Sequence, residues 1–229
     1  MILKQYTNSY RYNSDTIFLY NFISELGIKG SVLDVGSGCG ILGLLIKRDF
    51  SNIALTQIEI QEKYAKLSKQ NAAINDIKSN VICEDFLNFN FKDKFDFIIT
   101  NPPFYHKGTL KSKDYSLYLS RHSDALSFDK LATRAYKMLN HKGSFIFCYD
   151  AKQTDLLFKS LLVAKFNINE VQFVHVNKEK DASLVMVYAK RESKSLCRFL
   201  PPLILYEDNN YTKEIENIYK KADTNSEDI

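Results

Sequence analysis

Short apolar runs alternate with stretches of helical periodicity along most of this 229-residue chain. The run at 94–100 is almost continuously apolar, which is typical of a strand buried on both faces of a parallel sheet. Strands are predicted at residues 32–35, 53–58, 80–83, 94–100, 143–148, 169–176 and 183–189. Helices are predicted at residues 16–26, 41–46, 61–75, 128–139, 154–165 and 213–221. The alternation predicts an α/β fold with a mostly parallel sheet and helices on both faces.

The first strand, turn and helix form the most informative stretch of the pattern. The run ending at Val35 is followed by Gly36-Ser37-Gly38-Cys39-Gly40 and then by a helical pattern. This order is typical of the first unit of a nucleotide-binding α/β domain, because glycines allow a tight turn and close approach of a ligand. Gly38, Gly40 and Gly43 also match the dinucleotide motif G-x-G-x-x-G, so the glycines alone leave the nucleotide open.

Asp34 favours one nucleotide over the other. It lies two residues before Gly36, at the carboxyl end of the predicted strand. A carboxylate there repels the pyrophosphate of a dinucleotide but attracts the sulfonium and amine of S-adenosylmethionine (SAM). The pattern D-x-G-x-G-x-G therefore favours SAM over NAD. The alternative, a glycine turn that binds nothing, fits the strand–turn–helix context less well.

Further acidic residues follow the next two predicted strands. Glu59 ends the second strand, next to Ile60, where a carboxylate can hydrogen-bond ribose hydroxyls. It could instead be an acid at the start of a helix. After the third strand, Asp85 and Phe86 could bind an adenine amine and its ring, or Glu84 and Asp85 could form a simple polar turn. Spacing alone leaves these two interpretations equal.

The fourth strand ends in Asn101-Pro102-Pro103-Phe104. Two prolines fix the backbone and remove two N–H donors, so the chain can neither continue the sheet nor enter a helix directly. A rigid loop with a side-chain amide, free carbonyls and an aromatic ring then projects from the ligand-binding edge of the sheet. An isolated tetrapeptide of this kind could be a plain turn. Its place after a buried strand favours a catalytic role.

Two flanking segments carry candidate binding residues. Lys107, Lys111 and Lys113 lie in a stretch without periodicity, and Arg121 follows; these cations could contact RNA phosphates or simply be solvated. Near the start of the chain, the segment from Arg11 through Ser14 and Asp15 could close over a cofactor. Alternatively it begins a helix that covers one edge of the sheet.

Composition adds limits on the function. The formal net charge of +4 permits a nucleic-acid partner without requiring one. Cys39, Cys83, Cys148 and Cys197 lack metal-ligand or disulfide spacing, so we expect reduced thiols, a cytoplasmic protein and no metal. We expect neither a signal peptide nor a membrane span. The expected organisation is an N-terminal segment (1–30), a central domain (31–190), a C-terminal extension (191–222) and a disordered tail (223–229).

Two motifs together carry a resemblance. The pairing of D-V-G-S-G-C-G with N-P-P-F resembles the class I SAM-dependent methyltransferases that act on exocyclic nitrogens. The order of Tyr10–Asp15, the glycine turn, N-P-P-F, Ser120-Arg121-His122 and Pro201-Pro202-Leu203 resembles the bacterial valine-tRNA adenine-N6-methyltransferase family. The resemblance implies a Rossmann-like fold with a mostly parallel seven-stranded sheet whose last strand is antiparallel. It also implies SAM as cofactor, tRNA as partner and methylation of the adenine 3′ of the anticodon.

The resemblance assigns roles residue by residue. Asn101, Pro102, Pro103 and Phe104 would hold the target base. Arg11, Ser14 and Asp15 would close the SAM pocket. The pocket itself would be lined by Asp34, Gly36, Ser37, Gly38, Gly40, Glu59, Ile60, Asp85, Phe86 and Asn101.

Other functions fit the sequence less well. A protein-glutamine methyltransferase would use the same N-P-P chemistry, but such enzymes generally carry a helical domain before the glycine turn, where only about thirty residues stand here. Methylation of an rRNA base is a further variant, whereas DNA adenine methyltransferases usually need a recognition domain. A non-catalytic binding module would be expected to have lost part of either motif, and an NAD-dependent oxidoreductase would leave N-P-P-F without a purpose. We expect a monomer.

Overall fold

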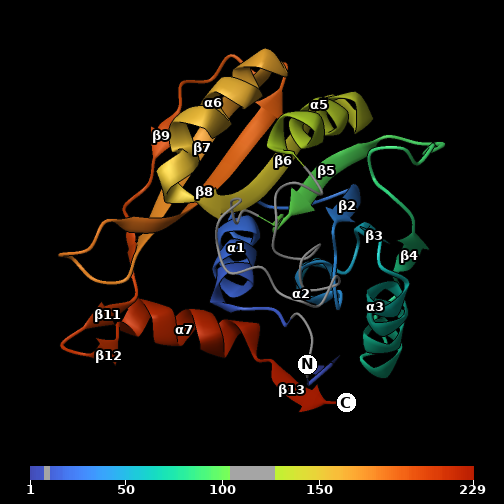
Figure 1. Cartoon of the computed structure of the whole chain (residues 1–229), viewed down its shortest axis with the longest axis horizontal. Helices are drawn as coiled ribbons and strands as arrows, with labels where there is room; N and C mark the ends of the chain where they lie inside the picture. The colour runs from blue at the N-terminus through green and yellow to red at the C-terminus, as the bar shows by residue number, and fades with distance from the viewer. Residues whose placement is uncertain (8–10, 104–126) are drawn as a thin grey trace.

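The structure, a computed structural model, describes residues 1–7, 11–103 and 127–229. A large twisted sheet lies at its centre, with strands in the order β10-β7-β8-β6-β5-β2-β3-β4 and β9 paired with β7 (Figure 1). Its strands are β2 (Ser31–Val35), β3 (Ala54–Glu59), β4 (Asn80–Cys83), β5 (Phe95–Thr100), β6 (Leu139–Asp150), β7 (Phe166–His175), β8 (Ala182–Arg191), β9 (Arg198–Phe199) and β10 (Leu203–Ile204). The helices are α1 (Ser14–Ser24), α2 (Ile41–Asp49), α3 (Glu62–Ile74), α5 (Phe128–Met138), η1 (Ala151–Gln153), α6 (Thr154–Val163) and α7 (Lys213–Ala222).

The strand directions confirm the predicted topology. β2 pairs in parallel with both β3 and β5, and β5 pairs in parallel with β6. The last long strand, β8, is antiparallel to both β6 and β7. Because β2 and β5 are neighbours that run the same way, the glycine turn after β2 and Asn101 after β5 leave the sheet at the same edge.

The predicted number of strands was too small. All seven predicted strands are present, but β9 and β10 extend the described sheet to nine by pairing in parallel with β7. These two-residue strands lie along what would otherwise be an open edge, whose unpaired N–H and C=O groups need partners. Leu203 of β10 pairs with Val174 and is buried. Such short segments lack the alternation that identifies a strand in sequence.

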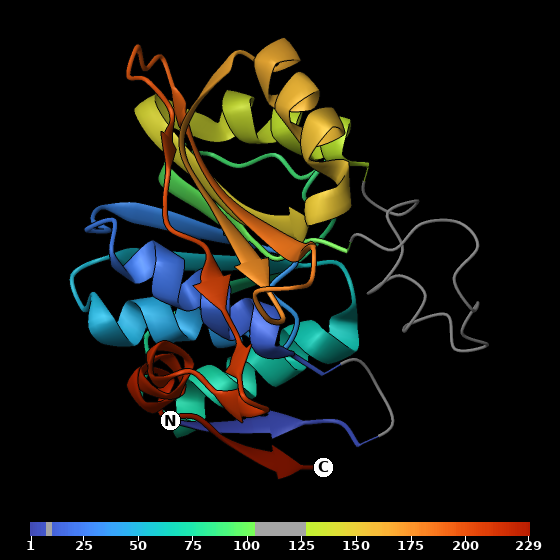
Figure 2. The ribbon, with the colours of Figure 1, turned by 90° about the vertical axis from the view of Figure 1, so that its left-hand side faces the viewer.

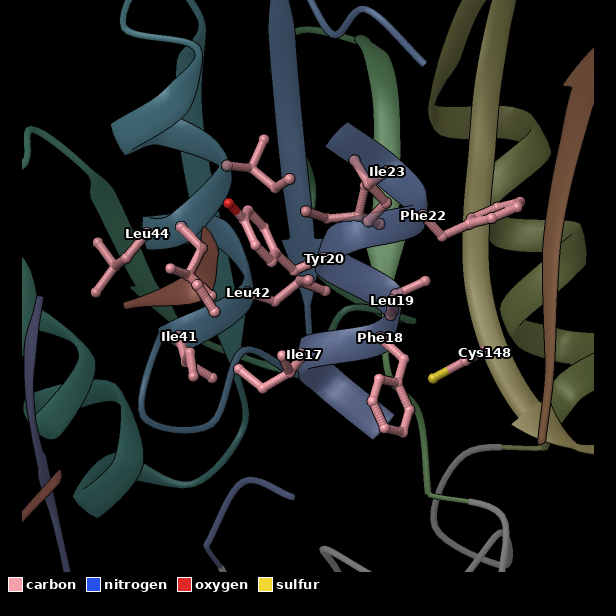
Figure 3. Close-up of a cluster of buried hydrophobic side chains, with 14 of the residues drawn as sticks. Ile17, Phe18, Leu19, Tyr20, Phe22, Ile23, Ile41, Leu42, Leu44 and Cys148 are labelled. Carbon is pink, nitrogen blue, oxygen red and sulfur yellow. The ribbon is translucent and has the colours of Figure 1, made fainter. Parts of the chain in front are cut away.

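Helices cover both faces of the sheet and create two hydrophobic clusters. In the edge-on view of Figure 2, α5 and α6 lie on one side, and α1, α2, α3 and α7 lie on the other. Successive strand residues point to opposite faces, so Val32 belongs to the α1–α2 cluster and Leu33 to the α5–α6 cluster. Ile99 and Ile98 of β5 divide in the same way. Figure 3 shows α1 inserted between α2 and β6.

The C-terminal residues are ordered, contrary to the prediction for 223–229. β13 (Asn225–Asp228) pairs in parallel with β1 (Ile2–Gln5), which the sequence also failed to predict. Asn71 of α3 and Asn75, the residue that caps the C-terminus of α3, hold β1 through hydrogen bonds to the backbone of Lys4 and Ile2. The pairing uses backbone groups, so the polar composition of this tail gave no sign of it.

The remaining elements complete the extension after the sheet. β11 (Tyr206–Glu207) and β12 (Asn210–Tyr211) form a small hairpin that leads into α7. Thr212 caps α7 by accepting a hydrogen bond from the Ile215 N–H. The α7 residue Tyr219 packs against Phe18 of α1, with 6.1 Å between ring centroids.

Three global features bear on function. All four cysteines are free. Within the described ranges, no helix has the length and apolar character needed to cross a bilayer. In the same ranges, no cluster of three or more His, Cys, Asp or Glu side chains is arranged to hold a metal ion.

Candidate functional site

The glycine turn has a backbone that glycine alone adopts readily. Gly36, Gly38 and Gly40 have φ values of +66°, +55° and +92°, in the left-handed region that disfavours side chains. The N–H groups of Gly36 and Ser37 donate to the Ile58 carbonyl on β3, at 2.9 and 3.2 Å. A Cβ added at Gly36 would meet no atom within 4 Å, so the space above this residue is open. The Ile58 carbonyl therefore fixes the turn on the side of β3, whereas the side of Gly36 where a Cβ would point is open.

Asp34 lies under the turn and is almost completely buried. Its Oδ2 accepts hydrogen bonds from the Gly43 N–H at 3.0 Å and from Gln57 Nε2 at 3.2 Å. These bonds require Gly43, because a Cβ there would lie 2.9 Å from the same Oδ2. Burial raises the pKa of Asp34 to about 7, against an ordinary value of 3.8. A cation placed beside this carboxylate would relieve the cost of its burial.

Glu59, at the end of β3, also holds the turn. Its Oε2 accepts from the Gly38 N–H and its Oε1 accepts from the Gln61 N–H, both at 2.9 Å. Burial raises the pKa of Glu59. The carboxylate therefore lies at the predicted place, and its binding to a ribose stays a prediction. Ile60, the next residue, is exposed.

A small hollow lies above the turn and brings several predicted residues together. It is bounded by the N-terminal segment, the turn, the start of α2 and the end of β5; its lining residues are Tyr12, Thr16, Asp34, Gly36, Ser37, Gly38, Cys39, Ile41, Leu42 and Asn101. The Ser37 hydroxyl is buried and, within the described ranges, is the side-chain polar atom left without a hydrogen-bond partner. Such an atom is available to a ligand that can supply a hydrogen-bond partner.

Asn101 lines the hollow together with the turn. Its Nδ2 donates to Thr16 Oγ1 at 2.9 Å, and its Oδ1 accepts from Cys148 Sγ at 3.2 Å. Pro102 is buried and Pro103 is half-buried. Phe104, together with the predicted RNA contacts Lys107, Lys111, Lys113 and Arg121, lies outside the described residues.

Two other groups of predicted residues lie away from the hollow's lining. The Asp85 carboxylate accepts from the Leu87 N–H at 2.9 Å and from Asn88 Nδ2 at 2.6 Å, as a polar turn requires. The Phe86 ring is buried in the α5–α6 cluster, 6.1 Å from the ring of Phe91. Contact of Asp85 and Phe86 with an adenine stays a prediction.

In the N-terminal segment, the sequence predicted three site residues, Arg11, Ser14 and Asp15, but missed Tyr12. Arg11 forms an ion pair with Asp228 of β13. Asp15 accepts from Asn13 Nδ2 at 2.7 Å, and burial raises its pKa. Ser14 begins α1. The residue that lines the hollow here is Tyr12, whose neighbours in sequence were predicted while it was not.

Thr16 and Cys148 were also missed. Thr16 contacts Asn101 from 85 positions away and Cys148 contacts it from 47 positions away. No local motif connects positions so far apart. The only available signal was that α1 was expected beside the site.

Comparison with solved structures shows the fold. The fold matches that of a predicted O-methyltransferase from Agrobacterium tumefaciens, with a TM-score of 0.70, over 94% of this chain and 100% of that one at 17% identity. The architecture is that of the class I methyltransferases.

The chain belongs to the methyltransferase small domain family, whose profile matches residues 11–172. A relative from Bacteroides thetaiotaomicron is 33% identical over 117 residues, 50% of this chain and 49% of the relative. A relative from Pedobacter heparinus is 26% identical over 175 residues, 74% of this chain and 73% of the relative. Both are named tRNA1(Val) (adenine(37)-N6)-methyltransferase. The match with the Bacteroides relative therefore spans about half of that protein's length.

Proposed function

We propose that this protein transfers a methyl group from SAM to the exocyclic N6 amine of an adenine in tRNA. One observation carries the proposal: the glycine turn after β2 and Asn101 after β5 line one hollow. The names of the relatives support tRNA as the acceptor and adenine N6 as the target, with the anticodon-loop adenine of valine tRNA as the specific site.

The residues of the turn fit SAM. Asp34 offers a negative charge to a cationic donor, the open space above Gly36 admits a ligand against the backbone, and Ser37 offers an unused hydroxyl. We assign Glu59 to the ribose, and Asp85 and Phe86 to the adenine of the donor. When bound, SAM supplies an electrophilic methyl group on a sulfonium.

The acceptor side activates an unreactive amine. The N6 lone pair of adenine is delocalised into the ring, so the free amine is a poor nucleophile. If Asn101 Oδ1 and the Pro102 carbonyl each accept one N6–H, the nitrogen can move towards tetrahedral geometry and free its lone pair. Once this nitrogen carries the methyl group that a bound SAM would supply, its N6 proton would leave to solvent. The rate comes from positioning rather than from a strong base.

The proposal extends to the rest of the chain. The catalytic domain is assigned to residues 31–190, with 1–30 capping the donor site and 191–222 packed on the domain. Phe104 is assigned to stacking on the base, and Lys107, Lys111, Lys113 and Arg121 to RNA phosphates. The target base has to leave its stack to reach the hollow, and an anticodon-loop base does so at low cost. Free cysteines and the proposed tRNA substrate support a cytoplasmic enzyme, and we assign it as a monomer.

The test uses purified protein, methyl-labelled SAM and unmodified tRNA, with mass spectrometry of the digested nucleosides. We expect N6-methyladenosine in valine tRNA and none in a transcript whose adenine 3′ of the anticodon is replaced by guanine. Label that enters a protein glutamine or ribosomal RNA instead of tRNA would refute the proposed substrate.

Asn101→Ala tests the site itself. We expect turnover to fall by at least about a hundredfold, because the amine loses an acceptor in the transition state. The donor Kd, measured by calorimetry, should change little, since Asp34 and the turn remain. A variant that loses donor affinity in step with turnover would show that Asn101 is misassigned.

A further inference from the structure

The Asn101 amide is held on both sides by residues from other elements. Thr16, in the first turn of α1, accepts from Nδ2, and Cys148, in β6, donates to Oδ1. Thr16 is buried and Cys148 is completely buried. Figure 3 shows the Cys148 sulfur directed towards α1, beside Phe18.

These two partners hold the two ends of the amide. The oxygen and the NH2 group of asparagine have nearly the same shape, so only hydrogen-bond partners determine which end points where. A thiol can donate to the oxygen, and the Cys148 thiol stays protonated because burial raises its pKa well above 9. The Thr16 hydroxyl oxygen accepts from the NH2 group. The Thr16 hydroxyl can also donate, so the reversed amide would lose the thiol's hydrogen bond to its oxygen and would place an N–H against the sulfur, a weak acceptor.

The orientation matters for the proposed chemistry, on which this inference rests. A carbonyl oxygen has two lone pairs, and Cys148 engages one of them. The second can receive an N6–H of the target base. With the amide reversed, an N–H of Asn101 would face an N–H of the base, and the amine would lose an acceptor.

We propose that Thr16 and Cys148 are positioning residues that fix the Asn101 side-chain amide with its oxygen available to the acceptor amine. Neither residue is required to touch the methyl group. Thr16 anchors the amide more strongly than Cys148 does, because a thiol is a weak hydrogen-bond donor. The hydroxyl of Thr16 also couples the N-terminal helix to the catalytic loop across the hollow.

The first experiment compares Thr16→Val with Thr16→Ser. Valine has the shape of threonine without its hydroxyl, and serine restores the hydroxyl. We expect Thr16→Val to lower kcat about tenfold with a donor Kd within about twofold of the original, and Thr16→Ser to recover most of the lost kcat. Cys148→Ala should lower kcat about threefold. Equal kcat for Thr16→Val and Thr16→Ser would overturn the proposal.

A second measurement separates positioning from a general loss of structure. In an Asn101→Ala background, Thr16→Val should cause no further loss of residual turnover, because the side chain that it positions is already absent. A further tenfold loss in that background would show that Thr16 acts independently of Asn101. Thermal melting of each variant identifies any loss caused by unfolding.

A third measurement does not depend on the acceptor. In the donor-free protein, the Asn101 side-chain NH2 protons should exchange with solvent at least about tenfold faster in Thr16→Val than in Thr16→Ser, as measured by NMR. Equal exchange rates would refute the inference even if tRNA is methylated. Failure to methylate tRNA, with the exchange difference present, would refute only the proposed function.

Discussion

The buried carboxylate of Asp34 gives the sharpest quantitative prediction. Burial holds its pKa at about 7, whereas the ordinary value is 3.8. Hydrogen bonds from Gln57 and Gly43 act in the opposite direction, and the nearby Glu59 raises the pKa further. The informative perturbation is Asp34→Asn, which keeps the shape of the side chain and an oxygen for the Gly43 N–H, but removes the charge.

The sign of the pH effect on stability follows from the protonation of Asp34 in the folded and unfolded states. Between about pH 4 and pH 7, the folded protein retains a proton on Asp34 that the unfolded chain has released, so stability falls as pH rises through this window. Each pH unit between the two pKa values corresponds to about 1.4 kcal/mol, so the total is about 4 kcal/mol by pH 8. Asp34→Asn should therefore match the original protein at pH 4 and exceed its stability at pH 8. Chemical denaturation at the two pH values measures the difference.

Donor binding should show the opposite dependence. The cationic SAM favours the ionised form of Asp34, so its binding near pH 7 releases a proton from this residue. With a pKa of about 7, the affinity for SAM should be about tenfold weaker at pH 6 than at pH 8. Calorimetry in buffers of different ionisation enthalpy counts the released proton. Glu59→Gln is the control: it removes the smallest of the causes that raise the Asp34 pKa, so the midpoint should persist but move slightly below pH 7. Asp34→Asn should bind weakly at every pH. An affinity that is flat from pH 6 to pH 8, or unchanged in Asp34→Asn, would refute the assignment of Asp34.

Two further substitutions and one deletion test the architecture. Gly43→Ala places a Cβ 2.9 Å from Asp34 Oδ2, so we expect the free energy of unfolding to fall by about 1–3 kcal/mol. The Cβ of Gly36→Ala meets no atom, so this variant should lose only about 1–2 kcal/mol, from strain in the left-handed backbone. Gly36→Ala should weaken SAM binding more strongly than Gly43→Ala. A larger effect of Gly43→Ala than of Gly36→Ala on SAM Kd, compared at equal folded fraction, would contradict this order. Deletion of residues 223–229 removes the partners of Arg11 and Tyr12, so SAM Kd should rise several-fold with little change in the melting of the central sheet; an unchanged Kd would show that β13 does not support the hollow.

The sequence predicted the donor side of the site because that side is built locally. A strand, three glycines and a helix lie within one short stretch, and their conformational requirements appear directly in residue types such as Gly36 and Gly40. Glu59 and Asn101 could be located because parallel strands bring their carboxyl ends to one edge. The hydrophobic pattern was sufficient for the seven long strands.

The parts of the fold and of the site that the sequence did not predict depend on contacts between residues far apart in the chain. β1 and β13 pair through backbone groups at opposite ends of the chain, so the polar residues of β13 were mistaken for a disordered tail. Thr16 and Cys148 meet Asn101 only after α1 has packed between α2 and β6. Each of these residues is ordinary in its own segment, and its role arises from the packing.

The two buried acids explain how the site can be both ordered and receptive. Glu59 accepts from Gly38 and Asp34 accepts from Gly43, so both carboxylates hold the turn by neutral backbone donors. Neutral donors compensate only part of the loss of hydration, which is why burial raises the pKa of both groups. The hydroxyl and cationic groups of SAM would complete this compensation. The turn is therefore arranged in advance, while the electrostatic cost of its two acids remains for the ligand to offset.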